Sequence, residues 1–470
     1  MNRVAACALV AATVAVSQRG PAQGLDRTKR PVAGPPTPFV FPKMETKRLP
    51  NSLQVVVVED HSLPLVAVRA VVAADSVNDP RGKEGLYVLT AGMLREGTTT
   101  RTGQQLASEI AALGNAVTSS RFTTIPQNFA ASLELMADML MHPTFPDSGL
   151  ARLKVTLAAA KQRELEQAAT IPNRVFLSRL FGAEHPLART GLASEASMSR
   201  ITRDDLVQFH SIYYRPNMTT LVVVGDVRAA DVIAQASKTF GSWRPAEAPM
   251  WRAPGHALSP TTIYLIDRPG AQQSTVFVGT LGPERNSPDE AALETMAPIL
   301  GASGGSRLYE NLRERHGYMY VGTPAAVTWL RRFIPSIIGG SAAVAAAKTD
   351  SALIEWLAEL RGMGQRAPTA EEMTLARGAL IGTLPAQIET DDLIANRLMS
   401  MLQTGVPLDF YNSYGRRIEA VTPEQVRAAA AKYLDSSHLV IVVAGDRKTV
   451  EPLLRGANIA PIVVVEDPSK

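Results

Sequence analysis

The stretches Thr220-Leu-Val-Val-Val-Gly-Asp226 and Val440-Ile-Val-Val-Ala-Gly-Asp446 decide the fold of this chain. Each is a run of mostly β-branched residues that ends at Gly-Asp, which predicts a buried strand followed by a turn. A helical segment precedes each stretch and starts after a threonine, Thr202 or Thr422. Threonine is a favoured N-cap because its hydroxyl accepts a hydrogen bond from the first helical turn. We therefore predict the same helix–strand unit twice.

The interval between the two units is constant. Thr202 and Thr422 are 220 residues apart, and so are Gly225 and Gly445, so no insertion separates the matched points. The two halves also begin alike, each with two β runs split by a turn. These runs are Leu53–Val58 and Leu65–Val72 in the first half, and Ile263–Ile266 and Ser274–Val278 in the second. This series of matches predicts a duplicated domain.

Between these strands the pattern is mostly helical, for example over Thr102–Leu113, Phe129–Met141 and Asp147–Ala168. Strands near the ends of each half, with helices between them, predict an α+β fold. We expect two similar domains, each a mainly antiparallel sheet covered on one face by helices.

The bulk composition excludes several classes of protein. At 470 residues the chain is long enough for two to four domains. Its 46% hydrophobic and 20% charged content is that of a soluble globular protein. A formal charge of +4, without an interleaved basic and aromatic stripe, argues against nucleic-acid binding.

The first residues predict an export signal. Arg3 forms a short positive region, Val4–Val16 an apolar region, and Pro21-Ala22 a cleavage site. The apolar run is too short for a membrane span, which needs about 20 residues. Cys7 is the only cysteine and lies in this signal, so the mature chain forms no disulfide or thiolate metal site. We expect a periplasmic protein.

The remaining boundaries follow from composition and from the repeat. The chain divides into a signal peptide (1–22), a Pro- and Gly-rich extended arm (23–45), a first domain (46–243), a linker (244–260), a second domain (261–458) and a tail (459–470).

A segment of the first half resembles a known zinc motif. Gly85-Leu-Tyr-Val-Leu-Thr-Ala-Gly-Met-Leu-Arg-Glu-Gly-Thr98 is similar to the run G-L-x-H-x-x-E-H-M-x-x-x-G-T of the pitrilysin-type peptidases, family M16, and of its processing-peptidase-like branch. Val88, Ala91 and Gly92 stand where that motif has His, Glu and His. Zinc needs lone-pair donors at this helical spacing, and these side chains have none. We therefore expect no metal in this chain.

Other possible metal ligands are also weak candidates. None of the seven histidines stands three, four or five residues from another, so no helical His pair can form a metal face. Glu164 and Glu166 lie where the resemblance places a third zinc ligand. Without the histidines, we interpret them as an exposed helix face paired with Lys161 or Arg163.

The second half keeps more of the family's pattern. The run from Leu300 to Tyr320 resembles the second-half signature L-G-x-G-x-x-S-R-L-x-x-x-L-R-E-x-x-G-x-x-Y, with Ser303 in place of its second Gly. The resemblance assigns catalytic roles to Arg313 and Tyr320, which face the zinc in the family. It also places a loop beside the substrate path, formed by Gly301, Gly304, Gly305 and Ser306.

Each of these assignments has a structural alternative. Arg313 can instead pair with a carboxylate, and Tyr320 can pack in the sheet. Tight backbone packing after a helix explains the glycines equally well.

The resemblance covers residues 45 to 455 and implies a fold of the LuxS/MPP-like metallohydrolase type. It implies the zinc-less subunit of a heterodimeric peptidase, which binds peptide or unfolded protein and supplies Arg313 and Tyr320 to the zinc of an H-x-x-E-H partner. Two alternatives remain: a non-catalytic scaffold or peptide-binding module with the same fold, and a self-sufficient hydrolase. The chain has no G-x-S-x-G elbow and no mature cysteine nucleophile for the latter.

Overall fold

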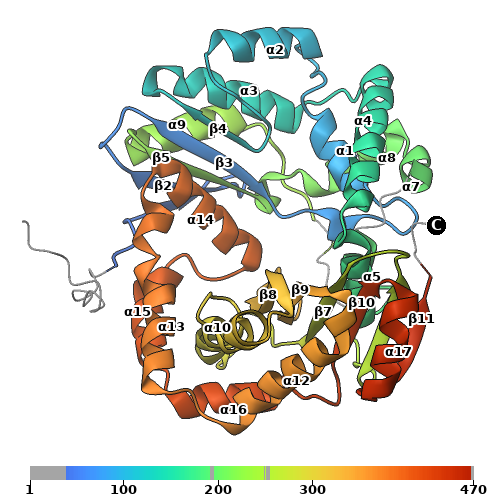
Figure 1. Cartoon of the computed structure of the whole chain (residues 1–470). Helices are drawn as coiled ribbons and strands as arrows, with labels where there is room; N and C mark the ends of the chain where they lie inside the picture. The colour runs from blue at the N-terminus through green and yellow to red at the C-terminus, as the bar shows by residue number, and fades with distance from the viewer. Residues whose placement is uncertain (1–38, 191–194, 248, 250–254, 467–470) are drawn as a thin grey trace, which may run out of the picture. The chain divides into compact units, whose positions relative to one another are not determined.

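Two β-sheets, one from each half of the chain, form the framework of the protein (Figure 1). The computed structural model describes residues 39–190, 195–247, 249 and 255–466. The first sheet consists of β1(Glu45–Arg48), β2(Gln54–Glu59), β5(Thr219–Gly225), β3(Val66–Val72) and β4(Arg121–Thr124), in that order. The second consists of β11(Ile462–Val465), β6(Thr262–Asp267), β10(Val440–Gly445), β7(Gln273–Leu281), β9(Ile337–Ala345) and β8(Met319–Thr328), in that order.

The predicted duplication and α+β fold are confirmed by the strand pairing. In the first sheet β2 and β5 are parallel and β5 and β3 antiparallel. In the second sheet β6 and β10 are parallel and β10 and β7 antiparallel, which repeats the same arrangement. The remaining pairs are antiparallel except β11 with β6. Both sheets are therefore mainly antiparallel.

Helices connect and cover the strands. Those of the first half are α1(Leu86–Met93), α2(Gly103–Ala112), α3(Phe129–Met141), α4(Asp147–Glu166), α5(Thr170–Phe181), α6(Pro186–Thr190), α7(Glu195–Ser199), α8(Arg203–Tyr213) and α9(Ala229–Phe240). Those of the second half are α10(Glu290–Leu300), α11(Arg307–Tyr309), α12(Thr349–Gln365), α13(Ala370–Gly382), α14(Asp391–Thr404), α15(Phe410–Glu419), α16(Pro423–Tyr433) and α17(Arg447–Ala457). Short 3₁₀ turns are η1(Ser76–Asn78), η2(Pro126–Asn128), η3(Pro216–Met218), η5(Ala346–Lys348) and η6(Pro385–Ile388), and η4(Glu310–Arg315) is π-helical.

The two predicted N-caps are confirmed. The Thr202 hydroxyl accepts a hydrogen bond from the N–H of Asp205, whose carboxylate accepts one from the N–H of Thr202. Thr422 and Gln425 form the same reciprocal pair at the start of α16, where Pro423 is the first residue. Each capping box satisfies two N–H groups that the helix itself leaves unpaired.

The expectation that helices cover only one face of each sheet is wrong. The first sheet packs one face on helices of its own half and the other on α13, α14 and α15 of the second half. The second sheet packs one face on helices of its own half and the other on α5 of the first half. In the first sheet, β2 shows the physical reason. All four residues of Val55–Val58 are buried, so both faces of this strand are apolar and both need a cover.

Described residues outside the two predicted domains also contribute to the fold. Phe41, in the predicted arm, is only 4% exposed, and its ring stacks on Tyr411 with centroids 5.8 Å apart. β11 lies within the predicted tail and pairs with β6. The predicted signal peptide lies outside the described residues. Among the residues that the structure describes, no helix is long and apolar enough to cross a membrane.

Candidate functional site

The helix that carries the zinc-like motif is firmly anchored at its start. The carboxylate of Asp79 accepts hydrogen bonds from the backbone N–H groups of Gly85 and Tyr87, at 2.8 and 2.7 Å. Burial raises the pKa of Asp79 to about 6, although these two hydrogen bonds oppose the increase. Gly85 has a φ of 104°, which only glycine adopts readily. The backbone of α1 therefore has a fixed position although the metal-binding side chains are missing.

The three motif positions on α1 do not fit a metal ion. Val88 is 42% exposed and Ala91 lines a cavity, but neither side chain has a donor atom. A Cβ added at Gly92 would lie 2.7 Å from Cδ2 of Leu153 on α4, so a larger side chain at this position would require Leu153 to move. These positions offer carbon and hydrogen where zinc requires nitrogen or oxygen.

The predicted role of the two glutamates on α4 as a solvated face is confirmed. Both are exposed, and Glu164 accepts a hydrogen bond from Lys161 at 2.7 Å. Glu166 lies in the last turn of the helix. Within the described part of the chain, no three His, Cys, Asp or Glu side chains are grouped as a metal site requires.

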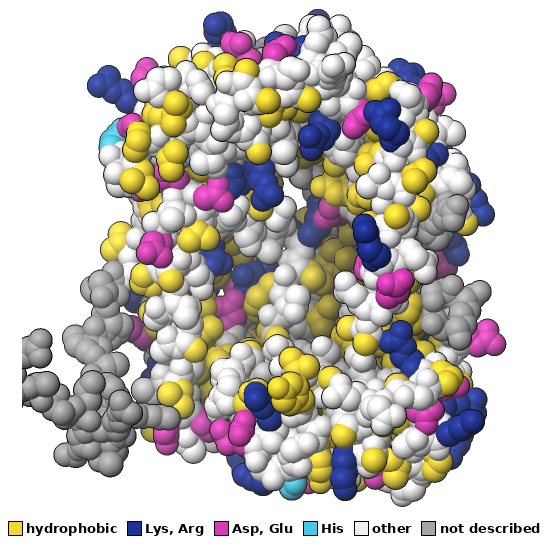
Figure 2. Space-filling model, turned by 45° about the horizontal axis from the view of Figure 1, so that its top comes forward, with side chains coloured by type: hydrophobic (Ala, Val, Ile, Leu, Met, Phe, Trp, Pro, Cys, Tyr) yellow, Lys and Arg dark blue, Asp and Glu magenta, His cyan; other side chains and the backbone are white. Residues whose placement is uncertain are grey.

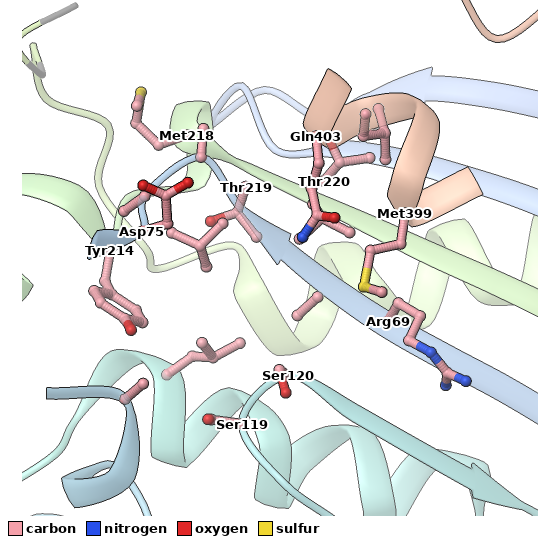
Figure 3. A pocket seen from close by; sticks show the side chains of 18 of the residues that line it. Arg69, Asp75, Ser119, Ser120, Tyr214, Met218, Thr219, Thr220, Met399 and Gln403 are labelled. Atoms are coloured by element: carbon pink, nitrogen blue, oxygen red, sulfur yellow. The ribbon is translucent and has the colours of Figure 1, made fainter. Parts of the chain in front are cut away.

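Ala91 lines a cavity of about 900 Å³ whose walls come from both halves of the chain. From the first half come residues of α1, β3 and β5, with Ser119 and Ser120 of the loop before β4. From the second half come Met399 and Gln403 of α14, and the segment Trp329–Arg331 between β8 and β9. Figure 3 shows the α14 side chains facing the two serines across the open space. This volume is typical of a ligand-binding pocket.

Arg313 and Tyr320, seven residues apart in sequence, lie side by side in the structure. Arg313 belongs to the π-helical turn η4, and Tyr320 follows on β8. The guanidinium carbon of Arg313 lies 5.7 Å from the centroid of the Tyr320 ring and 4.9 Å from that of Tyr309. The Arg313 side chain is 39% exposed and Tyr320 is 75% exposed, so both donors are accessible to a bound molecule.

The turn between these two residues is held by specific contacts. The backbone N–H of Gly317 donates to the carbonyl of Arg313 at 3.0 Å, and that of Tyr318 donates to Leu312 at 2.8 Å. Gly317 has a φ of 62°, which favours glycine and ends the helix. Upstream, the buried Asn311 donates to Glu355 and Glu359 of α12. The π-helical turn, a feature frequent at functional sites, is thereby tied to the core.

The structural alternatives for this pair are an ion pair of Arg313 with a carboxylate and packing of Tyr320 in the sheet. Within the described part of the chain, the carboxylate that lies within 4.0 Å of Arg313 is that of the adjacent Glu314, at 3.6 Å and itself exposed. Tyr320 lies on the outer edge strand of the second sheet and does not pack in the core. Sequence reasoning did not identify Tyr309, although its position four residues before Arg313 on a helix is a usable signal for a side-chain contact.

The glycine-rich loop before η4 contains two kinds of position. Gly301 is buried, and a Cβ there would lie 2.4 Å from the backbone nitrogen of Ala325 in β8. Gly304 and Gly305 are exposed, with nothing within 4 Å of an added Cβ. Ser306 is only 1% exposed and is the N-cap residue of α11. Of these four predicted substrate-binding residues, only Gly304 and Gly305 are directly accessible to a peptide.

The two parts of the candidate site are separate within this chain. The cavity beside α1 is lined by Ala91 but by neither Arg313 nor Tyr320. The Arg313–Tyr320 pair is exposed to solvent and is not part of the cavity wall.

Comparison with known proteins agrees with the fold and with both motif regions. The family model described as Insulinase (Peptidase family M16) matches residues 54–180, and the model described as Peptidase M16 inactive domain matches residues 200–380. An uncharacterized zinc protease of Mycobacterium leprae is 26% identical over 423 residues, which cover 87% of this chain and 93% of that protein.

Two solved structures have the same fold. The M16 inactive domain from Pseudomonas fluorescens is 25% identical and covers 86% of this chain and 98% of its own, with a TM-score of 0.76. The first half of the periplasmic protease PqqL from Escherichia coli is 16% identical and covers 90% and 98%, with a TM-score of 0.70. The chain belongs to peptidase family M16.

Proposed function

We propose that this chain is the zinc-less subunit of a periplasmic two-chain M16 peptidase. It binds peptide or unfolded protein and presents Arg313 and Tyr320 to substrate held at the zinc of an H-x-x-E-H partner. The main support is the contrast between the two motif regions. The helix α1 is folded without any metal-binding side chain, whereas the Arg313–Tyr320 pair is complete and exposed.

The chemistry of the two side chains suits this role. Hydrolysis of a peptide bond places negative charge on the carbonyl oxygen of the substrate. A guanidinium offers several N–H donors and a phenol offers one O–H donor, and neither competes for a metal. Such donors stabilise the developing charge when they are held in place before the reaction. The contacts that fix η4 and β8 provide this fixed geometry.

The exposure of the pair supports action on a substrate bound to another subunit. A pair that served a site inside this chain would line the cavity beside α1, and neither residue does. A surface-exposed edge strand can be reached by a second protein.

The proposal requires a partner, which we expect to carry an intact H-x-x-E-H motif and to co-purify with this chain. In the reconstituted pair, Arg313→Ala and Tyr320→Phe should each lower turnover about 100- to 1000-fold, the usual effect of losing one such donor. Arg315→Ala is the matched control, because Arg315 lies in the same turn, is exposed and has no ion pair among the described residues. It should leave turnover unchanged.

Assembly must be measured on the same variants, by size-exclusion chromatography. Unchanged turnover of the Arg313→Ala pair with intact assembly would contradict the catalytic role and favour the non-catalytic scaffold. Lost assembly in Arg313→Ala alone would make the residue an interface contact.

A further inference from the structure

We infer that the cavity beside α1 binds carboxylate groups, so that the preferred substrates are acidic peptide segments. This inference rests on the proposed function as a peptide-binding subunit and names the substrate class. The observation that carries it is the charge of the cavity wall.

The cavity wall is strongly biased toward positive charge. Among the described residues that line it, five are arginines and one, Asp75, is acidic. The chain as a whole has 48 basic and 44 acidic residues, so the cavity does not reflect the average composition. Figure 2 shows a hollow in the face that it draws, with Lys and Arg side chains and some Asp and Glu side chains around it.

Two of the five arginines have partners and hold the walls together. Arg69 on β3 donates to Asp392 of α14 at 2.6 Å and to Asn396 at 2.9 Å. Arg331 forms an ion pair with Asp75 at 2.7 Å. Both pairs join the first half of the chain to the second. Their positive charges are neutralised within the protein and are not available to a ligand.

The other three arginines, Arg48, Arg95 and Arg121, are exposed and have no carboxylate within 4.0 Å among the described residues. They come from three different elements. Arg48 is the last residue of β1, Arg95 follows α1, and Arg121 is the first residue of β4. Three unpaired guanidinium groups around one concave surface attract anions.

A carboxylate is the anion that suits a peptide-binding surface. The planar guanidinium offers parallel N–H donors that match the two oxygens of a carboxylate. The same wall contains hydroxyl donors, Ser119 and Ser120, and apolar contacts, Met399 and Leu402. A peptide with acidic and apolar side chains complements all three kinds of surface. Its carboxylates can come from Asp and Glu side chains or from a free C-terminus.

The test is a binding measurement with the purified chain. The probes are short unstructured peptides with a fluorescent label, which contain several Glu residues or Gln at the same positions. Each peptide is made with a free C-terminal acid and with an amide. Fluorescence anisotropy at low and high salt gives the dissociation constants, and comparison of the acid and amide forms identifies the source of the carboxylate.

We expect the carboxylate-bearing peptide to bind about tenfold more tightly than its neutral counterpart, because each exposed charge pair contributes a few-fold in affinity. High salt should reduce this preference. The triple variant R48Q/R95Q/R121Q should abolish it. R228Q/R361Q/R416Q is the matched control, because it removes the same charge from exposed arginines outside the cavity and should retain the preference.

Equal binding of acidic and neutral peptides, or an unchanged preference in the triple variant with an unchanged melting temperature, would overturn the substrate class. The proposed peptide-binding role would survive that result. If no peptide binds at all, both the inference and the peptide-binding role fail.

Discussion

Arg69 is a charged side chain that is 1% exposed at the contact between the two halves of the chain. Each of its three guanidinium nitrogens donates a hydrogen bond, Nε to Asn396, Nη1 to the carbonyl of Val68 and Nη2 to Asp392. The ion pair and hydrogen bonds offset the desolvation cost of burying this charge, and loss of the charged partner leaves an uncompensated charge in a low-dielectric environment. Arg69 therefore links β3 to α14 through Asp392 and Asn396.

Asp392→Asn should lower the free energy of unfolding by about 1–3 kcal/mol, less than for a fully buried pair because Asp392 is half exposed. Denaturant unfolding measures this difference. Glu389→Gln, an exposed change just before the same helix, is the control. An Asp392→Asn protein as stable as wild type would contradict the role assigned to the pair.

The same variant has a predictable pH dependence. Burial alone would raise the pKa of Asp392, but the hydrogen bonds from Arg69 and Thr123 and the charge of Arg69 lower it below its usual value. The contribution of Asp392 is therefore present above the pKa of the unfolded chain and is lost as pH falls through the lower folded value. The stability difference between wild type and Asp392→Asn should shrink on acidification.

His210 provides a second prediction. Burial lowers its pKa to about 4, while the hydrogen bond from its Nε2 to the carbonyl of Leu140 partly opposes this change. Because the fold favours neutral His210, it stabilises the protein above about pH 6.5. That contribution, about 3 kcal/mol, is lost as pH falls toward 4. His210→Gln should remove this loss, and the exposed His316→Gln should not.

The difference between wild type and variant is the informative quantity. Burial raises the pKa of Asp79 and of Asp391 to about 6, so these groups favour the folded state as pH falls through the same range. The wild-type profile contains both effects, but the variants differ only at one histidine. Identical pH profiles for wild type and His210→Gln would contradict the assignment.

At the residue scale, contacts between residues close in sequence could be predicted from their spacing. The interval of seven between Arg313 and Tyr320 spans one helical turn and one short loop, and the structure brings the two side chains together. The cavity arginines could not be predicted, because Arg48, Arg95 and Arg121 converge only through long-range packing.

At the scale of elements, β8 depends on the loop that precedes α11. Gly301 lies so close to Ala325 of β8 that even a methyl group collides with its backbone. Glycine is therefore required at position 301 because the backbone of β8 packs against it. At Gly304 nothing lies within 4 Å of an added Cβ, so a larger side chain fits there. The second-half signature thus combines a structural glycine with accessible ones.

Gly301→Ala should lower the free energy of unfolding by about 2 kcal/mol or more, since the clash is with main chain and β8 must shift. Gly304→Ala should change it by less than about 0.5 kcal/mol. Thermal unfolding of the two variants measures the contrast. Equal stabilities would show that the loop and β8 are not tightly coupled.

The strands and long helices were predictable because their hydrophobic patterns are local. The packing of helices on the second face of each sheet was not predicted. The four consecutive buried valines of β2 are nevertheless a sequence signal for burial on both faces. The local hydrophobic pattern of a strand does not indicate which helix covers its second face. α14 on the first sheet and α5 on the second come from the opposite half of the chain.

At the scale of the whole described unit, this exchange makes each half depend on the other. Residues 39–243 alone would expose the sheet face that contains Val56, Val58, Val222 and Val224. We expect this fragment to bind a hydrophobic dye and to unfold without a cooperative transition. Co-expression with residues 255–470 should restore both properties. A fragment that is cooperative and monomeric on its own would contradict the interdependence.

The central claim is that this chain contributes to peptide hydrolysis without holding the metal. Turnover of an unstructured peptide by this chain, by its H-x-x-E-H partner and by the mixture tests the claim most directly. We predict chelator-sensitive turnover by the mixture, much slower turnover by the partner alone, and none by this chain alone. Peptide cleavage by this chain alone that a chelator does not inhibit would contradict the account.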